Sequence, residues 1–95
     1  MPTYSLEFLP SALKEWQKLG TTVREQFKKK LADRLKEPSV RTARLRGAPD
    51  LYKIKLRASG FRLVYRIDDG RVVVVVISVG KRDKSKVYRS VDRRK

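Results

Sequence analysis

The chain has 95 residues, with 25 lysines and arginines against 10 aspartates and glutamates, and a formal net charge of +15. This length predicts one small domain spanning residues 1–95, and a hydrophobic content of 40% excludes a disordered basic tail. The charge favours a polyanionic partner: nucleic acid, an acidic protein or an anionic membrane surface. No apolar run is long enough to span a membrane, and the lack of cysteine suits the cytoplasm.

The first two predicted elements are a strand and a helix. Residues 3–8 alternate well enough between polar and apolar side chains to form a strand. Pro10 and Ser11 are expected to open a helix, and Gly20 is expected to cap its C-terminus. The apolar stripe of this helix consists of Leu13, Trp16 and Leu19.

A second helix is predicted from the capping-box pair Thr22 and Glu25 to the helix-terminating Pro38. Its apolar side chains recur every four positions, at Val23, Phe27, Leu31 and Leu35. Most of its cations lie off that stripe: Lys28, Lys29, Lys30 and Arg34. These cations either form a solvated helix face or dock on nucleic acid, and the sequence leaves both interpretations open.

A basic connector over residues 39–50, in which Leu45 begins a short strand, leads to a predicted hairpin. Residues 52–57 and 61–66 alternate apolar and cationic side chains at period two, the pattern of half-buried strands. A tight turn at residues 59–60 is expected to join them.

Placing Ala58 opposite Phe61 sets the expected register of this hairpin. The expected pairs are Tyr52–Ile67, Ile54–Tyr65 and Leu56–Leu63 on the apolar face, with Lys53–Arg66 and Arg57–Arg62 on the cationic face. Like charges opposite each other destabilise a sheet by a few tenths to about 1 kcal/mol per pair. A fold that accepts this repulsion on one face is expected to present that face to an anion.

The last predicted strand follows a tight turn at residues 68–70 and covers residues 72–79, which are nearly all β-branched and apolar. Pairing Asp68 with Arg71 directs every second side chain to the cationic face. These side chains are Val73, Val75 and Ile77. They are expected to form an uncovered apolar patch, which usually marks a partner site. Its rim consists of Lys53, Lys55, Arg57, Arg62 and Arg66.

Together these elements predict an α+β fold. Two N-terminal helices are expected to pack on one face of a small, mostly antiparallel sheet, whose other face is basic and partly open. The tail from Asp83 is expected to form a short C-terminal helix with Val87, Tyr88 and Val91 on one side.

The available side-chain chemistry is narrow, because the chain has no histidine and no cysteine. Imidazole acid–base catalysis, thiol nucleophiles and the usual transition-metal sites are excluded, and the scattered acids predict no metal or other cofactor. The remaining lysine, arginine, tyrosine and serine side chains suit cleavage of RNA by its own 2′-hydroxyl, since arginine binds phosphate oxygens bidentately. A non-catalytic nucleic-acid-binding surface is the alternative.

Several segments of the sequence resemble the RelE toxins. They are Leu13-Lys14-Glu15-Trp16 with Lys18-Leu19-Gly20, and residues 45–57, 60–65 and 79–82. The resemblance runs from about Leu6 to Tyr88 and implies the toxin half of a toxin–antitoxin pair. Such a toxin enters the ribosomal A site and cleaves the messenger RNA there. The resemblance also implies a RelB-like antitoxin that neutralises the toxin, in a complex that binds its own operator DNA.

The resemblance places the active site on five residues: Lys53, Lys55, Arg62, Arg82 and Tyr88. Arg62 is expected to stabilise the charge on the phosphate, and Arg82 to stabilise or protonate the leaving 5′-oxygen. Lys53 and Lys55 are expected to orient the substrate and manage protons. Tyr88 is expected to activate the 2′-hydroxyl or stack on a base, so Tyr88 and Lys55 compete as general base. Three further cations are expected to position RNA: Arg46, Arg57 and Lys81.

Two other functions fit the sequence. The Arg-Leu-Val-Tyr strand (residues 62–65) and the Gly-Lys-Arg turn (residues 80–82) alone mark only the wider RelE/ParE superfamily. A ParE-like toxin that poisons DNA gyrase would therefore share the fold. A non-enzymatic, operator-binding partner of the antitoxin would share the charge.

Overall fold

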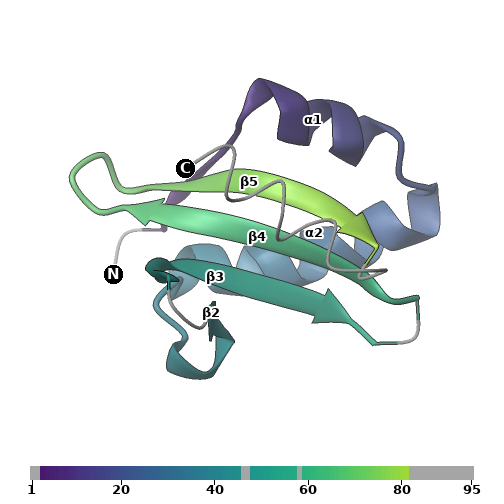
Figure 1. Ribbon diagram of the computed structural model, residues 1–95. Coiled ribbons are helices and arrows are strands. Elements are labelled where there is room, and N and C mark those ends of the chain that lie inside the picture. The colour runs from purple at the N-terminus through teal and green to yellow at the C-terminus, as the bar shows by residue number, and fades with distance from the viewer. Residues whose placement is uncertain (1–2, 46–47, 58, 82–95) are drawn as a thin grey trace.

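The computed structural model describes residues 3–45, 48–57 and 59–81, which form a five-stranded sheet with two helices (Figure 1). The helices are α1 (Pro10–Gln17) and α2 (Thr21–Lys36), and a 3₁₀ turn, η1, covers Arg41–Ala43. The strands are β1 (Ser5–Phe8), β2 (Arg44–Leu45), β3 (Ala48–Leu56), β4 (Phe61–Asp68) and β5 (Val73–Lys81). Their order is β1-β5-β4-β3-β2, with β1 parallel to β5 and the other neighbours antiparallel.

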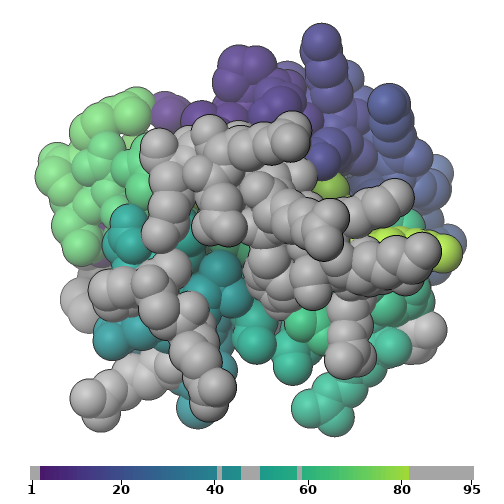
Figure 2. Space-filling model, viewed as in Figure 1, coloured from purple at the N-terminus to yellow at the C-terminus, as the bar shows by residue number. Residues whose placement is uncertain are grey.

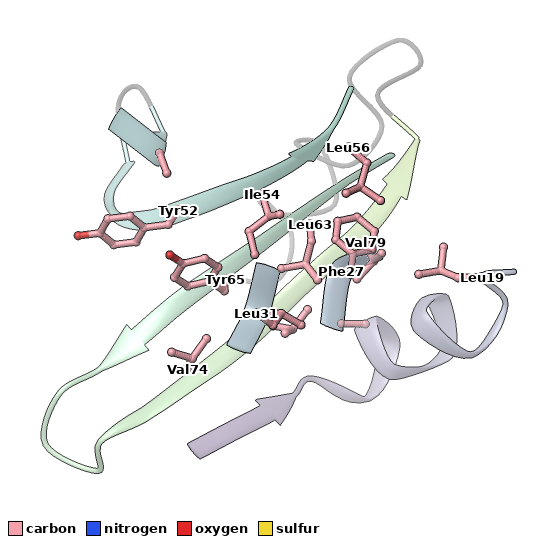
Figure 3. Packing of buried hydrophobic residues seen from close by; sticks show 13 residues of the cluster. Leu19, Phe27, Leu31, Tyr52, Ile54, Leu56, Leu63, Tyr65, Val74 and Val79 are labelled. Carbon is pink, nitrogen blue, oxygen red and sulfur yellow. The ribbon is translucent and has the colours of Figure 1, made fainter. Parts of the chain in front are cut away.

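Both helices pack on one face of this sheet, which confirms the predicted α+β architecture. Ala12 of α1 and Phe27 of α2 are fully buried in one cluster with strand side chains (Figure 3). The strand residues of this cluster are Tyr52, Ile54, Leu56, Leu63, Tyr65, Val74, Val76 and Val79. The predicted C-terminal helix, with Val87, Tyr88 and Val91, lies outside the described residues. No helix in the described ranges is long and apolar enough to cross a membrane.

The apolar stripe of α1 is partly as predicted. α1 begins at Pro10, whose fixed φ suits the first helical turn. Leu19 lies in the core, and Trp16 packs against it. Leu13, however, is 40% exposed, because the helix is rotated so that Ala12 faces the sheet instead. A small side chain at this position lets the helix approach β5 closely.

The junction between the helices differs from the prediction. Lys18 is the C-cap residue of α1, and Gly20 is the N-cap of α2, with φ −64° and ψ 155°. Thr22 is therefore already helical, and the predicted capping box with Glu25 is wrong. The end of α2 at Lys36 is close to the predicted stop before Pro38.

The hairpin of β3 and β4 has the predicted faces but not the predicted register. Leu56 pairs with Phe61, so the strands are displaced by two residues from the expected pairing. Gly60 supports this connection with φ +77°, and its N–H donates to the Leu56 carbonyl at 2.8 Å. Because side chains alternate with period two, a displacement by two leaves each one on its predicted face.

The displacement changes the partners of the cations. The observed pairs on this face are Leu51–Arg66, Lys53–Val64 and Lys55–Arg62. Lys55 thus replaces Arg57 as the partner of Arg62, and the predicted pairing of Lys53 with Arg66 is wrong. The described part of this hairpin holds a single direct pair of like charges.

The pairing of β4 with β5 is also displaced, and it contains a bulge. Asp68 pairs with Val73 and not with Arg71. The register shifts next to Tyr65, where Ile77 is the extra residue of β5. The valines that precede the bulge lie on their predicted faces. The position of the extra residue could not be predicted, because all side chains in this run are similar and β-branched.

The prediction of an uncovered apolar patch is wrong, because its side chains are buried. They form a second cluster, which consists of Leu51, Val64, Val73, Val75 and Ile77, with Leu9 and Leu45 packed against it. Val64 is 0% and Ile77 2% exposed. Burying apolar surface contributes roughly 25 cal/mol per Å². The fold therefore removes this area from water, and its cationic rim rather than an apolar centre is available to a partner.

Candidate functional site

The structure describes five of the eight candidate residues: Lys53, Lys55, Arg57, Arg62 and Lys81. The other three, Arg46, Arg82 and Tyr88, lie outside the described residues. Lys53 and Lys55 follow each other on one face of β3, and Arg62 lies directly opposite Lys55 on β4. The structure therefore brings three predicted catalytic residues together on the face that points away from the helices. We call Lys53, Lys55 and Arg62 the cationic triad.

Lys81 lies on the other face of the sheet. It pairs with Phe61, and its Nζ atom lies 5.6 Å from the centroid of the Phe61 ring. Phe61 packs against the core beneath the helices. The described structure thus does not bring Lys81 to the cationic triad.

The cationic triad is built from unlike side chains. Arg62 carries a planar fork of donors that matches two phosphate oxygens, whereas each lysine carries a compact ammonium group. Lys55 is exposed, and Lys53 and Arg62 are half-buried. Because Lys55 and Arg62 are opposite each other in the register, with Lys53 next along β3, the triad concentrates positive charge and hydrogen-bond donors that suit an anion.

A cavity of about 330 Å³ opens beside the triad. Its lining consists of Lys55, Leu56, Arg57, Gly60 and Arg62. This volume lies at the lower end of the range of about 300–1,000 Å³ that is typical of ligand sites. It suits part of one nucleotide. In Figure 2, side chains of β3 and β4, in teal and green, reach the lower edge of the molecule.

Arg34 of α2 connects the helix to the backbone of the triad. Its Nη1 atom donates to the Lys53 carbonyl oxygen at 3.1 Å and to the Tyr65 hydroxyl at 3.0 Å. The Tyr65 hydroxyl in turn donates to the Pro38 carbonyl at 2.8 Å. Tyr65 also stacks on Tyr52, with ring centroids 5.5 Å apart and an angle of 11° between the rings. This network fixes the backbone from which the Lys53 side chain projects.

Comparisons with known proteins identify the family. A family model described as the ParE toxin of the type II toxin–antitoxin system parDE matches residues 6–85. The mRNA interferase toxin RelE of Escherichia coli K12 is 62% identical over 85 residues, which cover 90% of each chain. The chain belongs to the RelE/ParE family of type II toxins. A second relative, described as a putative RelE-like toxin protein of E. coli, is 52% identical over the same share of each chain.

Solved structures of RelE share the RelE/ParE fold seen here. Free E. coli RelE, as an arginine-to-alanine double variant, matches with a TM-score of 0.90 and 57% identity over 98% of each chain. The same variant bound to a RelBc antitoxin peptide matches with a TM-score of 0.83 and 59% identity over 93% of each chain. The intact E. coli RelBE toxin–antitoxin complex matches with a TM-score of 0.82 and 60% identity, over 85% of this chain and 99% of that one.

Sequence reasoning missed the connecting role of Arg34 in this RelE/ParE toxin. The sequence groups Arg34 with the other cations of α2, most of which are exposed. The available signal was its position, next to Leu35 and three residues after the buried Leu31, which places it at the border of the apolar stripe. The identity of its acceptors depends on how α2 crosses β3 and β4, and no local pattern contains that information.

The buried phenol of Tyr65 makes stability depend on alkaline pH. Burial raises the pKa of Tyr65 above its usual value, and the neighbouring Arg34 offsets part of this effect. A raised folded-state pKa gives stability that is complete below the unfolded pKa of roughly 10 and is lost as the pH rises through the folded value. We therefore expect the free energy of unfolding to fall above about pH 10, and to fall less steeply in Tyr65→Phe.

Urea unfolding at successive pH values between neutral and strongly alkaline measures this difference. Tyr4 has a pKa that is raised by its hydrogen bond to Asp69, and it remains in both proteins, so the variant keeps part of the decline. If the free energy of unfolding fell equally with pH in the two proteins, Tyr65 would not contribute to the alkaline loss of stability.

Proposed function

We propose that this RelE/ParE toxin is an mRNA interferase that cleaves messenger RNA in the ribosomal A site through the cationic triad. The observation that carries the proposal is the direct pairing of Lys55 with Arg62, beside Lys53, on a chain 62% identical to the E. coli mRNA interferase RelE. Three cationic side chains placed together in this way can bind the oxygens of one phosphodiester.

The proposed reaction is an internal transesterification. The 2′-oxygen of the RNA forms a bond to the adjacent phosphorus, and the bond from phosphorus to the 5′-oxygen breaks. The 2′-hydroxyl gives its proton to a base, and the departing 5′-oxygen receives a proton. The products are a 2′,3′-cyclic phosphate and a 5′-hydroxyl end, so the step consumes no water.

The triad supplies binding and charge stabilisation for this step. The donor fork of Arg62 binds the non-bridging oxygens, on which negative charge grows in the transition state. Lys53 and Lys55 orient the phosphate, and Lys55 is one candidate for the base. Tyr88 is the other candidate base, and Arg82 stabilises the leaving oxygen. Arg57 and Arg46 hold the adjoining RNA, and Lys81 contacts RNA from the sheet's other face.

The proposed reaction requires no metal ion. In the described ranges, no group of three or more histidine, cysteine or acidic residues is placed to hold one. Positioned donors and a 2′-hydroxyl nucleophile account for the bond changes without it.

The charge also predicts the partners of the toxin. A RelB-like antitoxin with an acidic segment neutralises the cationic face, and the toxin–antitoxin complex binds operator DNA. The toxin acts in the cytoplasm, where ribosomes and messenger RNA are found.

Primer extension on a defined messenger RNA, in purified ribosomes stalled with an empty A site, tests the proposal. We expect the protein to create a new 5′ end inside the A-site codon. Polynucleotide kinase should label this end without phosphatase treatment, because the end carries a hydroxyl group. The same messenger RNA without ribosomes should remain largely intact, since the ribosome completes the alignment of the reacting groups.

Two outcomes would overturn the proposal. Binding to the stalled ribosomes without cleavage would indicate a non-catalytic partner of the antitoxin. Absence of ribosome binding, with DNA damage and intact messenger RNA in cells, would indicate a gyrase-directed toxin. That second reading has one observation in its favour, because the matching family model is described as the ParE toxin.

A further inference from the structure

We propose that α2 carries an RNA phosphate-binding track that extends the cationic triad around the free edge of β3. The triad would hold the phosphate that reacts, and the track would hold neighbouring phosphodiesters through Lys29 and Lys30. The link to cleavage rests on the proposed function, whereas the existence of the track does not.

The first observation is the open edge of β3. In the described ranges, β2 pairs with β3 only through Ala48 and Tyr52. Among the residues that the structure describes, the segment from Lys53 to Leu56 therefore has β4 on one side and no strand on the other. Instead, α2 lies beside this edge, and Arg34 bonds to the Lys53 carbonyl across the gap.

The second observation is a pair of cavities between this edge and α2. One has a volume of about 490 Å³, and its charged lining residues are Lys30, Asp33, Arg34, Lys53, Lys55 and Arg57. The other has a volume of about 540 Å³ and is lined by Gln26, Lys29, Lys30, Lys55, Leu56 and Arg57. Of the described residues that line these two cavities, Asp33 is the one that is acidic.

The third observation is continuity with the reaction face. Lys55 and Arg57 line both of these cavities and also the cavity beside Arg62. A polyanion that contacts Arg62 can therefore continue past Lys55 onto the lysines of α2 without leaving cationic surface. The basic run on this helix thus divides into two parts, with Lys29 and Lys30 on the track and Lys28 bonded to Glu25 at 3.3 Å.

These observations favour RNA over an acidic peptide. An amphipathic peptide needs apolar pockets that anchor its side chains. The surface of the first cavity is mostly polar, whereas that of the second is mostly apolar. The apolar residues among the described lining, Ala43, Ile54 and Leu56, are themselves buried, so the long stems of the lysines and Arg57 supply apolar surface and no exposed apolar pocket anchors a peptide side chain. Contacts to a phosphodiester backbone need only cations at suitable positions.

A binding experiment with a matched control tests the track. The test variant is Lys29→Gln with Lys30→Gln, and the control is Lys14→Gln with Lys28→Gln. All four lysines are exposed, and neither control residue lines any of the three cavities. Both variants lose two charges, so they differ in where the charges are lost and not in net charge. The probe is a fluorescein-labelled, 2′-O-methylated 12-nucleotide strand, which the protein cannot cleave.

Fluorescence anisotropy over a range of KCl concentrations gives the salt dependence. Each lost phosphate contact reduces the slope of log K against log[salt] by about 0.7 for a single strand, so two contacts reduce it by about 1.4. This corresponds to binding that is roughly 10–30-fold weaker at 0.1 M salt in the test variant, with a much smaller loss in the control. Equal slopes and affinities in the two variants would overturn the inference.

A second binding experiment, on stalled ribosomes, identifies the RNA that supplies the phosphates. Stalled ribosomes carry either a messenger RNA that continues through the A site or one that ends at the P-site codon. A binding defect of the test variant on the first ribosomes alone assigns the track to messenger RNA, and a defect on both assigns it to ribosomal RNA. Wild-type affinity on both would overturn the role of the track on the ribosome. Failure of the wild-type protein to cleave would count against the proposed function but leave the anisotropy result intact.

Discussion

Replacing Arg62 with alanine is expected to slow messenger RNA cleavage on the ribosome by roughly 10²–10³-fold, the usual effect of removing one donor to developing charge. Lys53 and Lys55 remain in Arg62→Ala, but point charges do not reproduce a fork that binds two phosphate oxygens. Single-turnover cleavage of messenger RNA in stalled ribosomes, followed by primer extension, measures the rate.

A folding control separates loss of activity from loss of structure in this variant. Arg62 is half-buried and lies directly opposite Lys55, so the free energy of unfolding of the variant is measured beside the cleavage rate. Loss of activity in a variant that remains folded at the assay temperature cannot be ascribed to unfolding. The matched control is Arg66→Ala, which removes the same side chain from the same face of β4, opposite Leu51 instead of a lysine. A folded Arg62→Ala protein as active as this control would contradict the assignment of Arg62.

Replacing Arg34 with alanine is expected to lower the free energy of unfolding by roughly 2–3 kcal/mol, because hydrogen bonds that involve a charged group contribute about 1.5–3 kcal/mol each and the side chain is only half-buried. The variant leaves the Lys53 carbonyl and one side of the Tyr65 hydroxyl without their donor. Chemical denaturation at neutral pH measures the change.

The same variant should also impair cleavage, because the segment that carries Lys53 is no longer tied to α2. Arg24→Ala is the control, since Arg24 is a half-buried arginine on the same helix. It should lower stability by less than about 1 kcal/mol. Similar losses of stability in the two variants would show that the hydrogen bonds of Arg34 add nothing to the stability that its side-chain stem provides by packing.

Period-two alternation predicts the faces of this sheet but not its register. Lys53, Lys55 and Arg62 lie on the expected face because a displacement by two residues preserves the side of every side chain. The same displacement changes the partner of Arg62 from Arg57 to Lys55. The register depends on the length of the connection, and Gly60 allows a longer one than the expected two-residue turn.

Features that depend on tertiary packing could not be predicted from local patterns. The rotation of α1 that exposes Leu13 is set by the fit of Ala12 against the sheet. The spacing of apolar residues in the sequence is compatible with either residue facing the core. The bulge at Ile77 lies in a run of similar side chains. The role of Arg34 requires acceptors from β3 and β4, which the sequence places 19 and 31 residues away.

The position of β5 has a consequence for how the toxin is made. β5 is the last strand of the described chain, yet it supports β4 on one side and β1 on the other, where Ser5 pairs with Val73. Contacts between segments so far apart in the chain form slowly, because a long loop must close first. A nascent or truncated chain that lacks β5 leaves β1 without its strand partner and β4 paired with β3 alone, so Arg62 loses its pairing with Gly80. Synthesis itself therefore delays toxicity until the ribosome has translated past the strand that completes the sheet.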